Sequence, residues 1–443
     1  MAAVSRVVAP LPAYGTAFAA VEDRLPGPGL RAWRRAAFTR FTEQGIPTRR
    51  AEDWKYTDIV RAANVPLMPA DRAEIGIEAI ATYLLGGPKA RRLIFVNGHL
   101  VPELSHARGL PPGVAVRSIA RTFEVEPDRV AEVLARANDE RSFTALNGAF
   151  AADGAWIELA DGADAGDPLQ LLFLSVGQTA PWMTHPRLVV LVGTGARLRL
   201  IESHIGLGAG ASLTNLVSQI EVATGGTLEH DRVELVGAEA THVGKTFVRL
   251  AAGAKLAQTV ATLGGGLVRN ETEARLEGVS VECLLNGVYH AAGREHVDNL
   301  IRVHHLAPSS HSDQFYKGLV DGRAHAVFAG KIIVHRDAQK TNAYQKNDNL
   351  LLSDDAEIDT KPELEIYADD VRCSHGATSG ELDASALFYL RSRGLPREAA
   401  ASLLTFAFAA EVVERFADAT VRRHVREAIA RRLPGGAALE ELA

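Results

Sequence analysis

The sequence is poor in cysteine, with Cys283 and Cys373 as its only two among 443 residues. Two thiols so far apart cannot form the disulfide framework of a small secreted protein. Neither has the paired Cys-x-x-Cys spacing of a closed zinc site. A reducing compartment fits best, so we expect a cytoplasmic protein without structural disulfides.

Long apolar runs are also missing. The longest charge-free helical stretch, residues 399–410, has 12 residues, whereas a helix needs about 20 to cross a bilayer. No membrane span is expected. Residues 7–21 are uncharged, but Pro10, Pro12 and Gly15 interrupt them. They are too weak for a secretory signal and are predicted to form a mobile N-terminus.

A basic excess is lacking as well. Lysine and arginine number 48 against 54 acidic residues, for a net charge of -6, which argues against binding to nucleic acid. The local exception is a cluster near the end of the chain, Arg422, Arg423, Arg426, Arg431 and Arg432. We interpret this cluster as the solvated face of an amphipathic helix.

No complete nucleotide-binding motif is present. Gly244-Lys-Thr246 has the end of a phosphate-binding loop, but Glu239 stands where that loop needs its first glycine. The glycines of residues 206–210 do not have the dinucleotide spacing either. An ATP site in this chain is therefore not expected.

Helical and extended segments divide the chain. Residues 27–84 and 119–150 show helical spacing of apolar residues, the second ending at Asn147-Gly148. Between them, residues 93–99 predict a strand followed by a tight turn at Asn97-Gly98. The N-terminal third is thus expected to be mainly helical.

Residues 155–372 have a different texture. They form a succession of short runs rich in Val, Leu, Thr and Ile, separated by Gly, Asp or Asn. A block this long without a long helix excludes an alternating βαβ sheet. Val297, Ile301 and Val303 share one face of a run whose other face is polar. The texture favours a β-solenoid, although no strict period is visible and a sandwich remains the rival.

Helices return at the end of the chain. Asp383 is placed to cap a first helix, which Gly394 ends, and Pro396 is placed to begin a second. In a third helix Val421, Val425 and Ile429 form an apolar stripe. These amphipathic helices need a surface to pack against.

Several histidines lie close together within residues 155–372. They are His290, His296, His304, His305 and His311, with Asp298 and Asp313 nearby. They could ligate a metal, but alternation places only His296, Asp298 and His304 on one face of a strand. We interpret these groups as surface or hydrogen-bonded residues.

Cys373-Ser-His375 is the sharper metal candidate. Alternation puts a soft thiolate and an imidazole on the same side of an extended segment, and both can bind iron or zinc. Two ligands do not close a site, so a partner chain would have to supply the others. The alternative is a buried thiol beside a histidine at a strand end.

A set of short segments is recognisable in combination: Arg49-Arg-Ala-Glu-Asp-Trp-Lys-Tyr-Thr57, Tyr316-Lys-Gly318, Phe328-Ala-Gly-Lys331, Ala338-Gln-Lys-Thr341, Asn349-Leu-Leu-Leu-Ser353, Leu364-Glu-Ile366, Asp369-Asp-Val-Arg-Cys-Ser-His-Gly-Ala-Thr378 and Leu387-Phe-Tyr-Leu-Arg-Ser-Arg-Gly394. Together they resemble the SufD family, whose members are subunits of the SufBCD iron–sulfur cluster assembly complex. SufB chains share some of these signatures, but they usually have glutamate where this chain has Gly376, and they carry further cysteines. The resemblance therefore favours SufD, with a SufB-like paralogue as the alternative.

This resemblance implies a mainly β fold, with a right-handed parallel β-helix over residues 151–378. An N-terminal mainly helical domain, 1–150, and a C-terminal helical domain, 379–443, would flank it. The β-helix is expected to pair with a SufB-type scaffold or, in isolation, with itself as a homodimer. The tail is expected to dock a SufC-type ABC ATPase through Leu387, Phe388, Tyr389, Leu390, Arg393 and Gly394.

By the same resemblance, Cys373 and His375 would ligate iron or a nascent cluster at the SufB interface. The chain alone is expected to hold no cofactor stably and to catalyse nothing, since ATP hydrolysis belongs to SufC. One rival hypothesis is a β-helix enzyme that cleaves a polysaccharide with Asp298 and Asp313 as its paired acids. Another is a pure interaction module in which Cys373 is inert.

Overall fold

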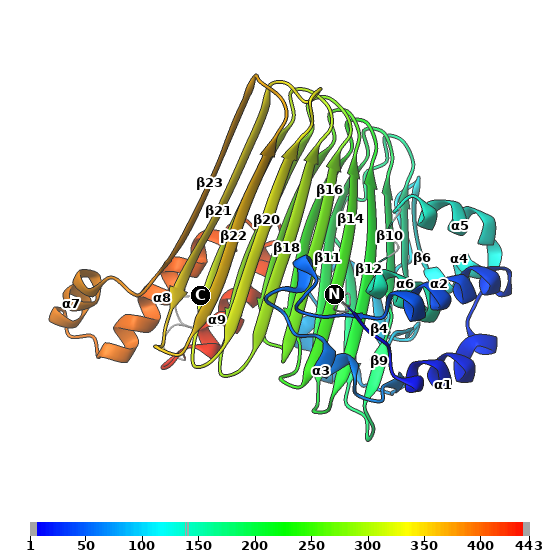
Figure 1. Ribbon diagram of the computed structural model, residues 1–443, viewed down its shortest axis with the longest axis horizontal. Helices are drawn as coiled ribbons and strands as arrows, with labels where there is room; N and C mark the ends of the chain where they lie inside the picture. Colours follow the sequence, from blue (N-terminus) through cyan, green and yellow to red (C-terminus); the bar gives the residue numbers. More distant parts are fainter. Residues whose placement is uncertain (1–6, 138, 140, 437–443) are drawn as a thin grey trace, which may run out of the picture.

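The computed structural model describes residues 7–137, 139 and 141–436, and its centre is a parallel β-solenoid (Figure 1). From β10 onward, even-numbered strands join one sheet and odd-numbered strands the other, so each strand pairs with the one two places along. We call these the even sheet and the odd sheet. All pairings between strands β10 to β23 are parallel. The mainly β fold with a β-helix core is confirmed, and the sandwich alternative is wrong.

The even sheet contains, from one end to the other, β22 (Glu357–Ile366), β20 (His325–Val334), β18 (His296–His305), β16 (Leu267–Leu276), β14 (Ala240–Leu250), β12 (Ser212–Val222), β10 (Arg187–Val192), β7 (Gly154–Leu159) and β6 (Val114–Ser118), with β9 (Trp182–Thr184) and β3 (Met68–Pro69) beside it. The odd sheet contains β23 (Val371–Gly380), β21 (Thr341–Leu351), β19 (His311–Val320), β17 (Glu282–Ala291), β15 (Lys255–Leu263), β13 (Thr227–Leu235), β11 (Arg197–Leu207), β8 (Leu169–Val176), β4 (Arg91–Val96) and β5 (His99–Leu100).

Alternation along each strand explains the core between the sheets. In β18, Val297, Ile301 and Val303 point inward and join one buried cluster with residues of both sheets, as their spacing predicts. Successive turns of the solenoid use glycine at equivalent places. Gly195 and Gly225, in the turns before β11 and β13, both have φ of 65°, which glycine adopts at little cost.

The N-terminal part covers the outer face of the even sheet (Figure 1), apart from residues 73–84, which pack on the odd sheet. Its helices are α1 (Pro12–Val21), α2 (Arg31–Gln44), α3 (Val60–Ala63), α4 (Ile119–Val125), α5 (Pro127–Ala135) and α6 (Ser142–Phe150), with 3₁₀ turns at Glu22–Arg24, Pro28–Leu30, Glu52–Trp54 and Ile77–Tyr83 and a small ladder of β1 (Val7–Val8) with β2 (Ile46–Pro47).

Two sequence expectations for this part are wrong. Residues 7–21 are not a free tail, because Pro12 starts helix α1 at its favoured first position and Tyr14 and Phe18 are buried. Asn147-Gly148 does not end a helix but lies inside α6, where Asn147 Nδ2 donates to the carbonyl of Pro186 (2.9 Å).

The predicted turn at Asn97-Gly98 is confirmed. Both residues have positive φ, and β4 and β5 form an antiparallel hairpin around them. β4 also pairs in parallel with β8, and β6 pairs with β7. The N-terminal part therefore supplies strands to both sheets as well as helices.

The C-terminal helices are α7 (Ala384–Ser392), α8 (Arg397–Val413) and α9 (Ala419–Arg432). Asp383 caps α7 and Gly394 has positive φ after it, as predicted. The stripe of α9 packs with α8 on the outer face of the odd sheet. Within the arginine cluster, Arg432 contacts the body through Glu295, so this residue is not merely solvated. Among the described residues, no helix is both long and apolar enough to cross a membrane.

Candidate functional site

The solenoid is open at the end formed by β22 and β23. These are the last strands of the two sheets, and each pairs with a neighbour on one side only. In Figure 1, α7 lies off one end of β23 and does not run along the strand. Most of β23 is exposed, and β22 is only half-buried. A sheet edge with free N–H and C=O groups is a template for pairing with another chain.

Cys373 and His375 lie on β23, on the face that continues the interior of the solenoid. They stand opposite Ala343 and Gln345 of β21 in parallel register. Cys373 is half-buried and packs at the edge of a cluster that contains Ile332, whereas His375 is exposed. The structure therefore brings the two predicted ligands to the same side of the terminal strand.

The two thiols differ in environment. Burial raises the pKa of Cys373 from its ordinary value, and a hydrogen bond with the backbone of Ala343 partly offsets this. The thiol is thus protonated at neutral pH, and a metal must displace that proton to bind. Cys283 is fully buried in the core, and burial raises its pKa to about 12, which makes it a packing residue.

Thiol labelling is expected to distinguish these environments. In native protein at pH 8, iodoacetamide should modify Cys373 at least ten times faster than Cys283, because Cys373 is partly exposed whereas Cys283 is fully buried. Intact mass should show one adduct per chain before denaturation and two after it. Cys373→Ser should remove the native adduct. Equal labelling of both thiols would contradict the burial of Cys283.

Below the terminal strand lies a polar layer that sequence reasoning missed. Gln345, under His375, is 2% exposed, and neither side-chain atom has a hydrogen-bond partner among the described residues. Nearby, Asn349 Nδ2 donates to the carbonyl of Thr378 on β23 (3.1 Å) and to Asn347 Oδ1 (2.7 Å). These amides face inward at every second position of β21. The alternation is visible in the sequence, but only the register shows that they lie beside the terminal strand.

The other predicted ligands do not converge. His296 Nε2 lies 2.9 Å from Thr57 Oγ1, Asp298 pairs with Arg269, and His304 lies 3.5 Å from His335. Their interpretation as hydrogen-bonded groups is confirmed. The remaining three point elsewhere: His290 and His305 are buried, and His311 lies on the odd sheet.

The paired acids of the polysaccharide-cleaving hypothesis are also apart. Asp298 lies on the outer face of the even sheet against Arg269, and Asp313 lies on the odd sheet, 3.4 Å from Arg415. Two carboxylates must face one substrate bond for glycoside hydrolysis. The geometry gives this hypothesis no support.

One mixed group of ligand atoms was missed. His325, Glu357 and Asp359 lie within 4.8 Å of one another on the outer face of the even sheet, and His325 Nε2 is 2.8 Å from Asp359 Oδ2. They meet because His325 and Glu357 are register partners on β20 and β22. The sequence alone does not indicate this pairing, because the two residues are far apart in the chain.

Helix α7 carries the predicted partner-binding residues. It projects from the body (Figure 1) and buries none of its residues. Phe388 is 73% exposed and Tyr389 56%, while Leu387 and Leu390 are half-buried and Arg393 stacks on the ring of Tyr389. Such exposure of two adjacent aromatic rings is typical of an interaction surface.

Comparison with known proteins points in one direction. Residues 174–408 match the family model described as "SUF system FeS cluster assembly, SufBD core domain", and residues 23–171 match "SufBD protein N-terminal region". The chain belongs to the SufBD family. The resemblance inferred from its motifs is confirmed.

Similar curated proteins carry consistent names. An iron–sulfur cluster assembly SufBD family protein of Synechocystis is 31% identical over 87% of each chain. The iron–sulfur cluster assembly protein SufD of Escherichia coli is 32% identical over 89% of this chain and 90% of its own. The chloroplastic protein ABCI7 of Arabidopsis thaliana is 27% identical over 86% and 81%. Membership of the SufBD family places this chain in iron–sulfur cluster assembly.

The SufBD core match covers the strands from β9 to β23 and helix α7. Both the open end with Cys373 and His375 and the exposed aromatic pair of α7 thus lie within the part of the chain that defines the family.

Proposed function

We propose that this chain is a non-catalytic SufD-type scaffold subunit. It pairs with a SufB-type scaffold through β22 and β23, and it docks a SufC-type ABC ATPase through α7. In isolation the same strands pair two copies of this chain as a homodimer. The chain holds no cofactor stably, and iron or a nascent cluster is its transient cargo. We place it in the cytoplasm.

The open end of the solenoid supports the pairing. β22 and β23 present unpaired backbone groups and half-exposed inward faces, with Val371 and Leu364 partly uncovered. A second solenoid end would satisfy these groups and bury those faces. Cys373 and His375 would then lie inside the interface, where ligands from the partner complete a site for iron or a cluster.

The C-terminal tail supports the docking of an ATPase. α8 and α9 pack on the odd sheet, whereas α7 precedes them in the chain and buries none of its residues. A motion of the ATPase against α7 would therefore be transmitted through rigid helices to the solenoid. Gly244-Lys-Thr246, which has the end of a phosphate-binding loop, lies inside strand β14 and not at a strand-to-helix turn.

Co-purification tests this proposal. A tagged full-length chain, produced with an untagged SufC-type ATPase from the same source, should retain the ATPase. Phe388→Ser with Tyr389→Ser should reduce retention at least tenfold, because it removes the two exposed rings. Tyr367→Ser, which removes another exposed ring (60% exposed) away from α7, is the matched control. Retention by the double variant equal to that of the control would contradict docking at α7.

A further inference from the structure

A buried polar layer crosses the interior of the solenoid far from the open end. Its members face inward because each lies an even number of positions from a core residue on the same strand. Glu234 lies six positions after Leu228 on β13, and His242 lies six positions before Val248 on β14. His242 is 1% exposed and Glu234 is fully buried. Polar groups in this position need partners or they destabilise the fold.

The carboxylates of this layer are unequally partnered. Two carboxylates, Glu202 and Glu234, are fully buried, and one guanidinium, Arg232, lies between them. Glu202 takes the close contacts, with Arg232 Nη2 at 3.0 Å and imidazoles of His204 and His230 at 2.7 and 2.9 Å. Glu234 has no comparably close cation, since Arg232 Nη1 lies 3.9 Å from its Oε1.

Glu234 keeps one oxygen without a partner. Its Oε2 accepts from Thr262 and from Asn270 Nδ2, both at 2.7 Å. Its Oε1 accepts no hydrogen bond within the described chain. A buried polar oxygen left without a partner destabilises the fold, and a bound cation would supply that partner.

Three acceptor atoms meet beside Gly244. His242 Nε2 lies 3.9 Å from Glu234 Oε1. A Cβ on Gly244 would lie 3.3 Å from His242 Nε2 and 3.0 Å from Asn270 Oδ1. None of these three atoms has a hydrogen-bond partner among the residues described. Asn270 turns its oxygen to this space because its nitrogen is held by Glu234.

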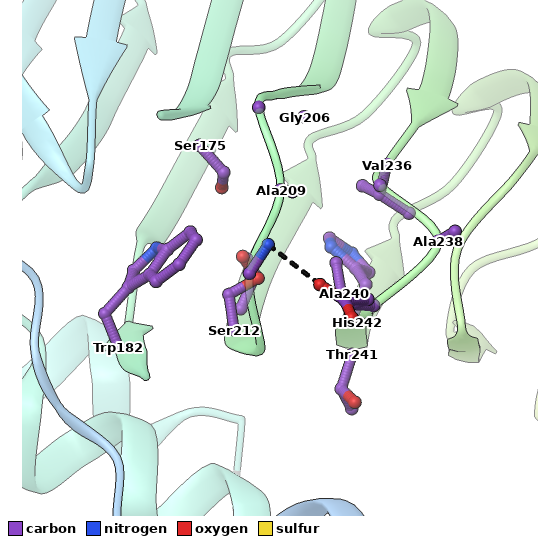
Figure 2. A pocket seen from close by; sticks show the side chains of 15 residues that line it. Ser175, Trp182, Gly206, Ala209, Ser212, Val236, Ala238, Ala240, Thr241 and His242 are labelled. Carbon is purple, nitrogen blue, oxygen red and sulfur yellow. Dashed lines mark hydrogen bonds between the residues drawn. The ribbon is translucent and has the colours of Figure 1, made fainter. Parts of the chain in front are cut away.

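His242 also lines a cavity that opens to the surface (Figure 2). The cavity measures about 290 Å³ and lies between the turns that precede β12 and β14, with Trp182 as one wall. Gly210 N donates to Glu239 (3.0 Å) across its mouth, which puts an exposed carboxylate at the entrance. A cation would thus find an acidic entrance and a path to His242.

We propose that His242, Glu234 and Asn270 bind a divalent transition metal ion in the space left by Gly244. Imidazole nitrogen with carboxylate and amide oxygens is a donor set suited to Fe²⁺, Mn²⁺, Co²⁺ or Zn²⁺. Metal–ligand bonds are about 2.1 Å, so one ion can bridge atoms 3.9 Å apart after a small inward shift.

The test is a titration with Co²⁺ followed by its visible absorption, in full-length chain. Cys373→Ser, His375→Ala and His325→Ala first remove the two other groups of candidate ligands described above. This background protein is expected to bind one equivalent of Co²⁺. Absence of binding to it would overturn the proposal. The proposal does not depend on any partner, so its failure leaves the proposed function untouched.

Two variants locate the ion. Gly244→Ala keeps every ligand but fills the space, and should weaken Co²⁺ binding at least tenfold, while Gly380→Ala, with nothing within 4 Å of its added methyl, should not. Glu234→Gln should weaken Co²⁺ binding at least tenfold, because it removes the one carboxylate of the proposed site. Unchanged affinity in either Gly244→Ala or Glu234→Gln would overturn the site.

Discussion

Replacing Gly287 with alanine is expected to destabilise the solenoid by about 3 kcal/mol or more, a cost typical of severe overpacking in a core. The added methyl would overlap the ring of Tyr316, which is 4% exposed and packs in the core between the sheets. Urea denaturation followed by circular dichroism would measure the loss as a lower midpoint at unchanged slope.

The reason lies in a checkerboard of glycine and tyrosine inside the odd sheet. Gly287 is the register partner of Tyr316, and Tyr289 is the register partner of Gly318. Each ring lies over the backbone of the opposing glycine. The Tyr289 hydroxyl in turn donates to Asn349 (2.5 Å), which bonds to β23. The rings therefore support the strand that carries Cys373 and His375.

Gly380→Ala is the matched control, because its methyl would meet no atom within 4 Å. It should change the free energy of unfolding by less than about 1 kcal/mol. A Gly287→Ala variant as stable as this control would show that the Tyr316 ring has room to move, contrary to the packing described.

The local order of the chain was predictable because short-range rules decide it. Asp383 capping α7 and the turn at Asn97-Gly98 both depend on a few neighbouring residues. Cys373 and His375 share a face because alternation over two residues is local. The resemblance to a known family then supplied the arrangement of domains and the expected partners.

The solenoid itself could not be read as a repeat. Register partners on successive odd strands are Arg197, Thr227, Lys255 and Glu282, so the spacing changes from turn to turn as the loops change length. Any contact between strands depends on that spacing. For this reason the sequence hid the meeting of His325 with Glu357 and that of His242 with Glu234.

The recognisable segment of residues 49–57 has a structural role that the sequence alone did not reveal. Trp54 lies over the guanidinium of Arg269, 4.0 Å from its ring centroid. Thr57 donates to Asp298, the carboxylate that pairs with Arg269. Two further ion pairs, Asp53 with Arg302 and Glu52 with Lys361, hold the same segment to the even sheet.

Arg269→Ala is therefore expected to cost about 3–5 kcal/mol, the range for breaking a buried ion pair from one side. Arg269 is 1% exposed, and its Nε donates to Glu271 (2.8 Å) while its guanidinium pairs with Asp298. Its loss removes the cation paired with buried Asp298, whereas Glu271 keeps Lys245 Nζ at 3.2 Å. The segment of residues 49–57 should then detach, and trypsin should cleave after Arg49, Arg50 or Lys55.

Urea denaturation and timed proteolysis measure the two effects. Arg249→Ala is the matched control, since Arg249 pairs with Glu277 at the surface with 39% of its side chain exposed, and an exposed pair contributes about 0–1 kcal/mol. Arg269→Lys should fall between the two, because it keeps the charge but loses the second hydrogen-bonding arm and the flat contact with Trp54. If Arg269→Ala matched Arg249→Ala in both measurements, the segment would be held by its surface ion pairs and not by the buried arginine.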